Sequence, residues 1–297
     1  MGNSASALNI KDLLDKSTEY LDSKGIESPR LNAEWLLAHT LGKERIELYL
    51  QFDRLLTESE TDEYRSLIKE RVSNKPLQYI IGEADFMGIR LELDENVLIP
   101  RPETEQLVEV ALERLKAHNG KTIKILDVGT GSGNIAIALA KFLPNAMVTA
   151  IEISEKAIAI ATRNAEQNEV ADKINFIIHD IKSDEFSQAG FDMIISNPPY
   201  ISLKTMDSLT NDVKEWEPEI ALTDFSDGLD MISEVIKLSM GRLNENGIIL
   251  LEIGGNRQSE PLKKMLSDAG YSNIKIESDY NSHARFASGV CLLSNSI

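Results

Sequence analysis

The hydrophobic residues of the N-terminal quarter of the chain recur every three or four positions, which is typical of amphipathic helices. Leucine-rich runs of this kind end at Gly25 and Gly42, and glycine often follows the last turn of a helix. A further run extends from Glu58 to Val72 and has Thr57, a favoured N-cap residue, directly before it. We therefore predict a small helical bundle over residues 1–75.

The pattern then changes. Between residues 77 and 93 apolar and aromatic side chains predominate, and we predict two strands that are joined through residues 82–85. The prolines of Ile99–Pro102 favour an extended backbone. Residues 76–102 are therefore predicted to form a β-hairpin linker, and an amphipathic helix follows it.

Beyond residue 120 short apolar strands alternate with helices. This alternation is typical of a parallel sheet whose two faces are both covered by helices. We therefore predict an α/β domain over residues 103–297. The expected strands lie at residues 123–128, 147–153, 174–178, 191–196 and 248–253, with a closing pair at 274–278 and 286–293.

Length and composition agree with this organisation. The 297 residues suffice for about two domains, and 42% hydrophobic with 27% charged residues is ordinary for a globular protein. No stretch approaches the ~18 apolar residues of a membrane span, and the N-terminus lacks a secretory signal pattern. Cys291 is the only cysteine, so we expect no disulfide, no cysteine-based metal site, and a cytoplasmic protein without a membrane partner.

The net charge of the chain and its first six residues give information about possible binding partners. The formal net charge is −17. Proteins that bind duplex nucleic acid neutralise phosphates with Lys and Arg, so this acidic excess weighs against nucleic acid, although a local basic patch can exist in an acidic chain. Met1–Ser6 fits an N-myristoylation pattern, but so short a pattern recurs by chance, and we interpret it as a tail or cloning remnant.

A glycine-rich turn directly follows the first strand of the α/β domain. Glycine lets the backbone turn tightly and approach a ligand without an intervening Cβ atom. The free N–H groups of the following helix start can contact polar ligand atoms. An acidic residue two positions before the first glycine favours a cationic or hydroxyl-rich ligand over a pyrophosphate. The turn comprises Asp127, Val128, Gly129, Thr130, Gly131, Ser132 and Gly133.

Two further acidic residues follow the next two strands. In an open α/β sheet, ligands bind outside the carboxyl ends of the strands. Glu152 is therefore placed to accept both hydroxyls of an adenosine ribose. Asp180 is placed to meet an adenine amino group, although a turn-forming Asp is an equally good interpretation.

The fourth strand ends in Asn197-Pro198-Pro199-Tyr200. Consecutive prolines fix the backbone and remove two N–H donors, so the side-chain oxygen of Asn197 and the carbonyl oxygen of Pro198 remain as acceptors. A planar NH2 group offers two donors that match these two acceptors. Tyr200 adds an aromatic face. The motif therefore predicts a site that holds a flat amine or amide.

Together, the glycine-rich turn and Asn-Pro-Pro-Tyr resemble the S-adenosylmethionine-dependent methyltransferases that modify planar nitrogen atoms. Residues 76–82, Phe86 and residues 98–105 narrow the resemblance to the peptide chain release factor glutamine methyltransferases. The Ile-Pro-Arg-Pro-Glu-Thr-Glu stretch is the most specific piece, and the resemblance extends over nearly the whole chain. Further matching pieces lie at residues 217–218, 221–222, 227–229, 252–254 and 279–280 and at Arg285.

The resemblance implies a small all-α domain that docks the substrate, followed along the chain by a Rossmann-like, seven-stranded class I methyltransferase domain. It implies S-adenosyl-L-methionine as the cofactor and peptide chain release factors as protein partners, without direct binding of nucleic acid. The expected reaction transfers a methyl group to the side-chain amide nitrogen N5 of the glutamine in the GGQ motif of a release factor.

The resemblance also implies roles for single residues. Asn197, Pro198 and Tyr200 are expected to be catalytic, and these three with Pro199 to bind the target glutamine. Two departures concern the cofactor, since residue 152 is Glu where Asp is common and residue 181 is Ile where an aromatic residue is common. The residues expected to bind the cofactor are Asp127, Gly129, Thr130, Gly131, Ser132, Gly133, Glu152, Asp180, Ile181, Asn197 and, at its methionine end, Phe86.

Other functions stay open at this point. Asn-Pro-Pro-Tyr also occurs in methyltransferases of nucleic acid base amines, such as adenine N6 or guanine N2, and a glutamine of a ribosomal protein is another candidate target. A non-catalytic cofactor-binding module is the alternative outside enzymes. For the main hypothesis we expect Asn197 Oδ1 and the Pro198 carbonyl oxygen each to accept one N–H of the target amide.

Overall fold

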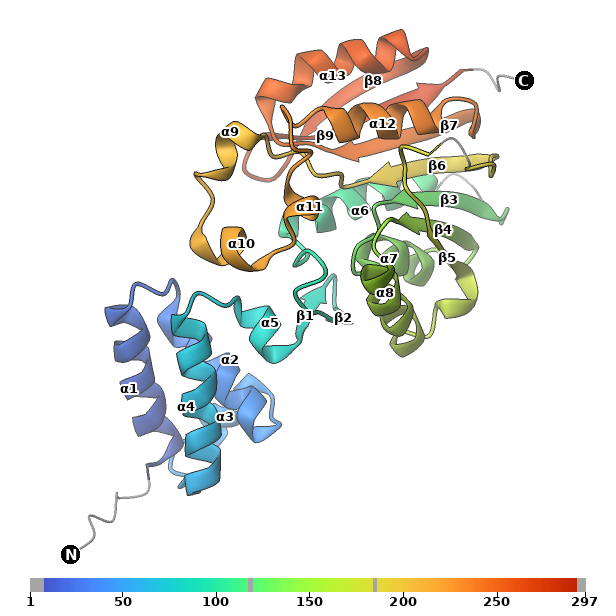
Figure 1. Cartoon of the computed structure of the whole chain (residues 1–297). Coiled ribbons are helices and arrows are strands. Elements are labelled where there is room, and N and C mark those ends of the chain that lie inside the picture. The colour runs from blue at the N-terminus through green and yellow to red at the C-terminus, as the bar shows by residue number, and fades with distance from the viewer. Residues whose placement is uncertain (1–7, 117–119, 184–185, 293–297) are drawn as a thin grey trace, which may run out of the picture. The chain divides into compact units, whose positions relative to one another are not determined.

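A computed structural model describes residues 8–116, 120–183 and 186–292 of the chain (Figure 1). The chain folds into two compact units, one of Met1–Gly82 with Thr210–Trp216 and the other of Glu83–Leu209 with Glu217–Ile297. Within the described residues, no helix has the length and apolar character needed to cross a membrane. The Met1–Ser6 pattern lies outside the described residues.

The first unit is helical, and side-chain caps set where its helices begin. The side chain of Asn9 accepts a hydrogen bond from the backbone N–H of Asp12, and Thr57 with Glu60 forms a capping box. Gly42 ends a helix in the left-handed conformation, with φ 59°. The helices are α1 Ile10–Ser23, α2 Pro29–Leu41, α3 Arg45–Leu50, α4 Glu58–Val72, α5 Leu77–Ile81 and α10 Asn211–Trp216.

The segment Leu77–Ile81 is a helix, so the strand predicted there is wrong. A short, mostly apolar run such as Leu-Gln-Tyr-Ile-Ile does not distinguish a helix from a strand, and tertiary packing decides between them. Here the apolar side chains of α5 pack on the core of the helical unit, and Gly82 ends the helix with φ 83°. A hairpin does form, but its first strand, β1 Glu83–Phe86, occupies most of the segment that was predicted to connect the two strands, and it pairs antiparallel with β2 Ile89–Glu92.

The second unit is built on a seven-stranded sheet with strand order β5-β4-β3-β6-β7-β9-β8. The strands from β5 to β7 are parallel, and β9 runs antiparallel to both of its neighbours. This mostly parallel sheet confirms the predicted α/β class. The strands are β3 Ile123–Val128, β4 Ala146–Glu152, β5 Ile174–Ile178, β6 Phe191–Ser196, β7 Leu243–Glu252, β8 Tyr271–Ser278 and β9 Ala284–Cys291.

Helices cover both faces of this sheet (Figure 1). Apolar side chains of α6 Pro102–Leu115 and α7 Asn134–Phe142 form one core, to which α8 Glu155–Gln167 and the hairpin contribute. On the other face, α12 Asp230–Ser239 and α13 Asn256–Asp268 form the second core. Shorter helices, η1 Ala171–Lys173, α9 Leu203–Met206 and α11 Glu219–Leu222, lie in the connections.

The order of the strands fixes where a ligand can bind. The chain runs from β3 outward to β4 and β5 and then returns to the other side of β3 as β6. At such a reversal the connections leave in opposite directions, and a crevice opens outside the carboxyl ends of the two strands. The glycine-rich turn follows β3 and Asn-Pro-Pro-Tyr follows β6, so both motifs lie at the sheet edge where such a crevice is expected.

Candidate active site

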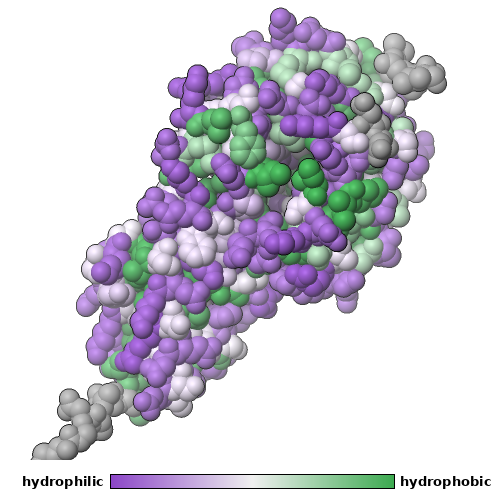
Figure 2. All heavy atoms as spheres, in the orientation of Figure 1, coloured by the Kyte–Doolittle hydropathy of each residue, from purple (hydrophilic) through white to green (hydrophobic). Residues whose placement is uncertain are grey.

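Four polar side chains line the C-terminal edge of the parallel strands. The register pairs Val128 of β3 with Ile151 of β4 and with Ser196 of β6, so these strands end side by side. On the face drawn in Figure 2, hydrophobic side chains gather around a hollow in this unit. The four side chains come from the ends of β3, β4, β6 and β7 and are Asp127, Glu152, Asn197 and Glu252.

The three glycines of the turn have two different roles. All three have positive φ, 74° at Gly129, 54° at Gly131 and 83° at Gly133. A Cβ atom on Gly129 or Gly131 would meet no atom within 4 Å, so the space in front of the turn is open. A Cβ atom on Gly133 would lie 3.0 Å from Ile137 and 3.1 Å from Ala161. Gly133 therefore lets two helices pack closely, whereas the first two glycines leave room for a ligand.

Asp127 lies beneath this turn. Its side chain is fully buried, and Oδ2 accepts a hydrogen bond of 2.6 Å from the hydroxyl of Thr130, which fixes the turn from below. Burial raises the pKa of the Asp127 carboxyl to about 7, against the opposing hydrogen bonds of Thr130 and the backbone of Ala136. Within the described residues, Oδ1 has no hydrogen-bond partner. An unpartnered acceptor under an open turn suits a ligand that carries an N–H donor or a positive charge.

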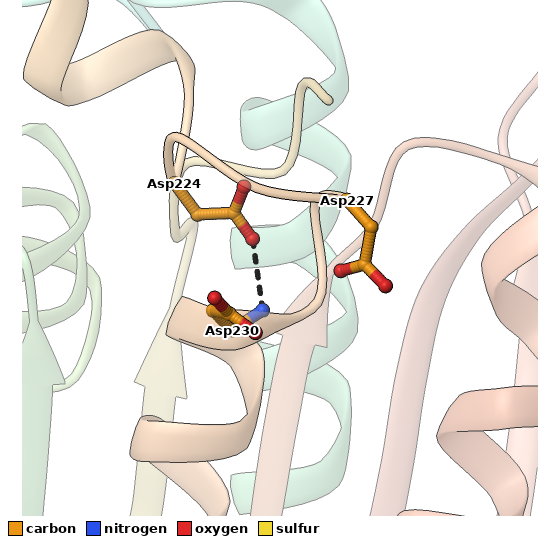
Figure 3. A group of neighbouring side chains, drawn as sticks. All are labelled: Asp224, Asp227 and Asp230. Atoms are coloured by element: carbon orange, nitrogen blue, oxygen red, sulfur yellow. Dashed lines mark hydrogen bonds between the residues drawn. The ribbon is translucent and has the colours of Figure 1, made fainter. Parts of the chain in front are cut away.

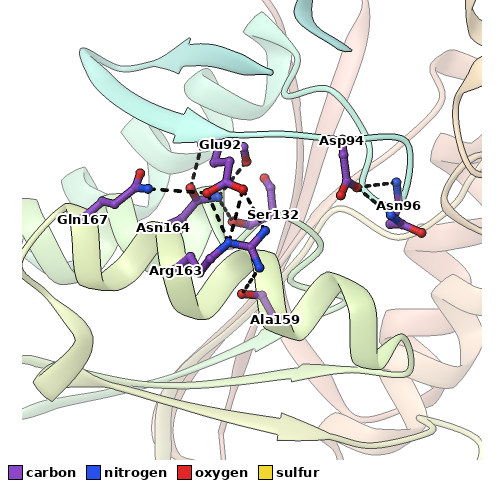
Figure 4. Close-up of polar contacts among 8 residues, drawn as sticks. All are labelled: Glu92, Asp94, Asn96, Ser132, Ala159, Arg163, Asn164 and Gln167. Carbon is purple, nitrogen blue, oxygen red and sulfur yellow. Dashed lines mark hydrogen bonds and ion pairs between the residues drawn. The ribbon is translucent and has the colours of Figure 1, made fainter. Parts of the chain in front are cut away.

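Asn164 of α8 holds the other side of the turn, a role that sequence reasoning missed. Its fully buried amide donates to the carbonyl oxygens of Ser132 and Glu92, both at 3.0 Å, and its Oδ1 accepts from the backbone N–H of Glu92 at 2.7 Å. Arg163 adds an ion pair of 2.8 Å to the Glu92 carboxylate (Figure 4). The hairpin, α8 and the turn are therefore tied together through one amide. An Asn among the apolar positions of a helix was the available signal.

Glu152 is fixed beside the turn by backbone donors. Its carboxylate accepts from the N–H of Gly131 at 3.2 Å, and from those of Ile153 and Ser154 at 2.9 and 3.0 Å. Ile153 is 48% exposed. A half-buried carboxylate beside an exposed apolar side chain suits the ribose and base of a nucleoside. Sequence reasoning named Glu152 but not Ile153.

The remaining residues expected to contact the cofactor have different environments. Asp180 is exposed and accepts a hydrogen bond from the backbone N–H of Lys182, so it forms its own turn just beyond the end of β5. Ile181 is half-buried and packs on the second core. Phe86 is 1% exposed and lies in the first core. The cofactor contacts of these three residues stay predictions.

The side chain of Asn197 is fixed by a chain of hydrogen bonds. Its Nδ2 donates to Thr104 Oγ1 at 3.0 Å, and the Thr104 hydroxyl donates to Glu252 Oε2 at 2.8 Å. The hydroxyl of Tyr200 donates to the other oxygen of the same carboxylate at 3.0 Å. Within the described residues, no hydrogen bond ends on Asn197 Oδ1 or on the carbonyl oxygen of Pro198. Both oxygens that the sequence predicts to be acceptors are therefore available to accept hydrogen bonds from a ligand.

The Glu252 carboxyl lies at the centre of this network and is fully buried. Burial raises the pKa of its carboxyl to about 7, and the hydrogen bonds from Thr104 and Tyr200 oppose that shift. The positive charge of Arg285 also lowers the pKa, whereas Glu103 raises it. Burial and the neighbouring Glu252 likewise raise the pKa of the Tyr200 phenol, which therefore remains a hydrogen-bond donor.

Two glycines and one glutamine support Tyr200 from behind. A Cβ atom on Gly254 would lie 2.9 Å from Tyr200 Cδ2, so the ring packs directly against the backbone. Gln258 donates to the carbonyl oxygens of Tyr200 and Gly228 at 3.1 and 2.9 Å. Its Oε1 accepts from the N–H of Gly254 at 2.6 Å. The backbone and the ring of Tyr200 are thus held in one position.

Asp224 shapes the loop that carries Gly228. Its carboxylate accepts hydrogen bonds from the backbone N–H groups of Ser226, Gly228 and Asp230, at 2.9, 3.0 and 2.8 Å. Asp227 and Asp230 bring two further carboxylates nearby (Figure 3). Through these three hydrogen bonds, Asp224 fixes the loop so that Gly228 packs against Tyr200.

The pieces that carry the family resemblance are scattered in sequence but meet here. Thr104 from residues 98–105 and Glu252 from residues 252–254 join Asn197 and Tyr200. Arg101 forms an ion pair with Glu217, and Arg285 forms one with Asp279. Sequence reasoning noticed these pieces but assigned them no role, because their partners lie many residues away.

Comparison with known proteins identifies the families that this chain matches. The PrmC N-terminal domain family matches residues 12–82, and the methyltransferase small domain family matches residues 104–213. A release factor glutamine methyltransferase of Rhodopirellula baltica is 38% identical over 281 residues, 94% of this chain and 95% of the relative. One of Chlorobaculum tepidum is 38% identical over 279 residues, 92% of this chain and 94% of the relative.

A solved structure also shares the fold. The hMettl16 catalytic domain in complex with the MAT2A 3′UTR hairpin 6 has a TM-score of 0.56 to this chain and covers 82% of it, with 86% of that structure covered in return. The two sequences are 17% identical, so the likeness concerns the fold alone.

Proposed function

This chain belongs to the family of release factor glutamine methyltransferases, and we propose that Asn197 and Pro198 hold the target amide for methyl transfer. The enzyme methylates the side-chain amide of a release factor glutamine and uses S-adenosylmethionine as its cofactor. We place the target in the GGQ motif, with N5 as the atom that accepts the methyl group.

The residues around the turn suit this cofactor. When bound, S-adenosylmethionine supplies an electrophilic methyl group on a positively charged sulfur. Open space over Gly129 and Gly131, the unpartnered Asp127 Oδ1 and the fixed carboxylate of Glu152 offer room, an acceptor and a partner for ribose hydroxyls. These features support a nucleoside with a charged amino acid end. The assignment of single cofactor contacts to these residues is part of the proposal.

The observation that carries the mechanism is the hydrogen bond from Asn197 Nδ2 to Thr104, which leaves Asn197 Oδ1 unused. In the proposed complex this oxygen and the Pro198 carbonyl oxygen each accept one N–H of the target glutamine. The NH2 group is thereby turned so that its nitrogen faces the methyl carbon. Positioning of this kind can supply on the order of 7–11 kcal/mol of the barrier.

The same two acceptor oxygens also stabilise the positive charge that develops during methyl transfer. As the nitrogen–carbon bond forms and the carbon–sulfur bond breaks, positive charge develops on the amide nitrogen. Asn197 Oδ1 and the Pro198 carbonyl oxygen stabilise that charge because their dipoles already point at it. The Tyr200 ring packs beside the reacting group. The extra proton of the nitrogen passes to water after transfer.

Charge and composition support the remaining assignments. A net charge of −17 favours protein over nucleic acid as the direct partner. The helical unit is proposed to dock the release factor, because it matches the PrmC N-terminal domain family as a unit separate from the methyltransferase domain. A single cysteine fits a cytoplasmic enzyme.

Labelled cofactor tests the function directly. Incubation with a release factor, a ribosomal protein fraction and RNA should place label in the release factor, at a glutamine identified by mass spectrometry. Label in RNA would favour the base methyltransferase alternative. Asn197→Ala should abolish transfer while calorimetry still detects cofactor binding, and an equal loss of both would contradict the role of Asn197.

A further inference from the structure

We infer that Thr104 and Glu252 are positioning residues for methyl transfer, because together they determine which atom of the Asn197 amide faces the target nitrogen. Thr104 lies in the first turn of α6, Asn197 follows β6 and Glu252 ends β7, so the three residues meet only in the folded unit. The inference rests on the role proposed for Asn197 and extends it to residues that touch neither substrate nor cofactor.

The available hydrogen-bond donors fix the orientation of the Asn197 amide. An ionised carboxylate can only accept hydrogen bonds. The single proton of the Thr104 hydroxyl therefore goes to Glu252, at 2.8 Å. Thr104 can then only accept from Asn197, so the amide atom that faces it, at 3.0 Å, must be Nδ2. An amide orientation is ordinarily assigned from its hydrogen-bond network, and while Glu252 is ionised this network leaves one choice.

The consequence is that Oδ1 is directed away from Thr104. A flipped amide would present an NH2 group to the target, and two NH2 groups cannot hydrogen-bond to each other as donors. It would also leave Asn197 Oδ1 facing a hydroxyl whose proton is already committed. The ionised Glu252 carboxylate thus fixes the orientation of the Asn197 amide, although Thr104 lies between them.

The same carboxylate holds the second motif residue. Tyr200 donates to Oε1 while Thr104 donates to Oε2, so each oxygen of Glu252 accepts one hydroxyl. The charged groups that face Glu252 are Arg285 from β9, which favours its ionised form, and Glu103 from α6, which opposes it. Arg285 is itself anchored to Asp279 and to the carbonyl oxygen of Ile253.

Protonation of Glu252 reverses this polarity. A proton on Oε2 makes Glu252 the donor to Thr104, and the Thr104 proton must then turn toward Asn197. The amide responds by placing Oδ1 inward and NH2 outward, which is the orientation that cannot hold the target. Because the pKa of Glu252 is raised to about 7, this change occurs at accessible pH, and transfer should be lost as the pH falls below neutral.

A matched pair of variants at Thr104 tests the inference in the full-length enzyme. Thr104→Val keeps the shape of the side chain but removes its acceptor and donor, whereas Thr104→Ser keeps both. We expect Thr104→Val to lower single-turnover methyl transfer to a release factor on the order of 10-fold, about 1.4 kcal/mol of barrier and within the cost of one unpaired buried group. Cofactor affinity should be unchanged, and Thr104→Ser should restore most of the rate.

The pH profile supplies a readout that a purely structural role would not move. Wild-type single-turnover rates should fall on the acid side of neutrality, and in Glu252→Gln, which cannot ionise, this limb should disappear. The inference is overturned if Thr104→Val transfers at the wild-type rate, if Thr104→Ser is as slow as Thr104→Val with both folded by circular dichroism, or if Glu252→Gln keeps the acid limb.

Asn197→Ala separates this inference from the proposed function. If Asn197→Ala is inactive but the two Thr104 variants behave as wild type, the role of Asn197 stands and the positioning network fails. If Asn197→Ala retains transfer, the proposed mechanism itself fails, and the positioning inference with it.

Discussion

The backbone of Gly228 lies so close to the backbone of Tyr200 that a Cβ atom on Gly228 would sit 2.3 Å from the Tyr200 carbonyl oxygen. Gly228 also has φ 90°, which favours glycine. The loop between α11 and α12 therefore packs directly behind the motif that ends β6. This contact makes the position of Tyr200 sensitive to a single added methyl group.

We expect Gly228→Ala to displace Tyr200 and the neighbouring Asn197. A misplacement of about 1 Å can cost about 100-fold in rate, so turnover should fall on that scale. Gly270→Ala is the matched control, because Gly270 has φ 86° but no atom within 4 Å of an added Cβ. Thermal unfolding and turnover of both variants separate the two effects. Equal turnover in the two variants would show that the contact does not position the motif.

Gly129 provides a test of the cofactor site. Its φ of 74° equals that of Gly25 in the helical unit, and an added Cβ meets no atom within 4 Å at either position. Gly129→Ala and Gly25→Ala should therefore each lose about 1 kcal/mol of stability from backbone strain. Only Gly129→Ala should weaken cofactor binding in calorimetry, by on the order of 10-fold, because its methyl group projects into the open space before the turn. Wild-type affinity in Gly129→Ala would place the cofactor elsewhere.

Asn164→Ala should destabilise both the hairpin and the turn. It removes two donors and one acceptor that serve Glu92 and Ser132, and each buried group left unpaired costs about 1–3 kcal/mol. We expect a loss on the order of 2–4 kcal/mol in denaturant unfolding, together with weaker cofactor binding. Asn168, the half-buried C-cap of α8, also donates to a hairpin carbonyl, that of Arg90, but its groups lie nearer to water. Asn168→Ala is therefore the control and should cost less than about 1 kcal/mol. Similar losses in the two variants would argue against a special role for Asn164.

The strands, and the backbone turns that carry the two motifs proposed to bind ligands, were predictable from sequence because their signals are local. Continuous apolar runs indicated the parallel strands. The glycines after β3 predicted a tight turn, and the prolines after β6 predicted a rigid backbone. Thr104, Glu252 and Asn164 were not predicted as site residues, because their roles depend on partners that the fold brings together. The strand expected at Leu77–Ile81 failed for a related reason, since packing on the helical core decided its structure.

The buried carboxyls of Asp127 and Glu252 predict how stability depends on pH. In both, burial raises the pKa of the folded state to about 7, above ordinary values near 4. The folded protein then binds protons more tightly than the unfolded chain, so the free energy of unfolding is highest below about pH 4 from these two groups and falls as the pH rises toward 7. Shifts of this size correspond to on the order of 4 kcal/mol for Asp127 and 3 kcal/mol for Glu252.

Replacing each carboxyl by its neutral amide isolates this contribution. Asp127→Asn and Glu252→Gln should each flatten the decline in the free energy of unfolding between pH 5 and pH 8, when followed by chemical denaturation at fixed ionic strength. The ionised form of Glu252 that orients Asn197 is therefore the form that stabilises the fold least, so activity and stability should change in opposite directions across neutral pH. If the wild-type enzyme were equally stable at pH 5 and pH 8, and the amide variants ran parallel to it, neither carboxyl would carry the raised pKa that this balance requires.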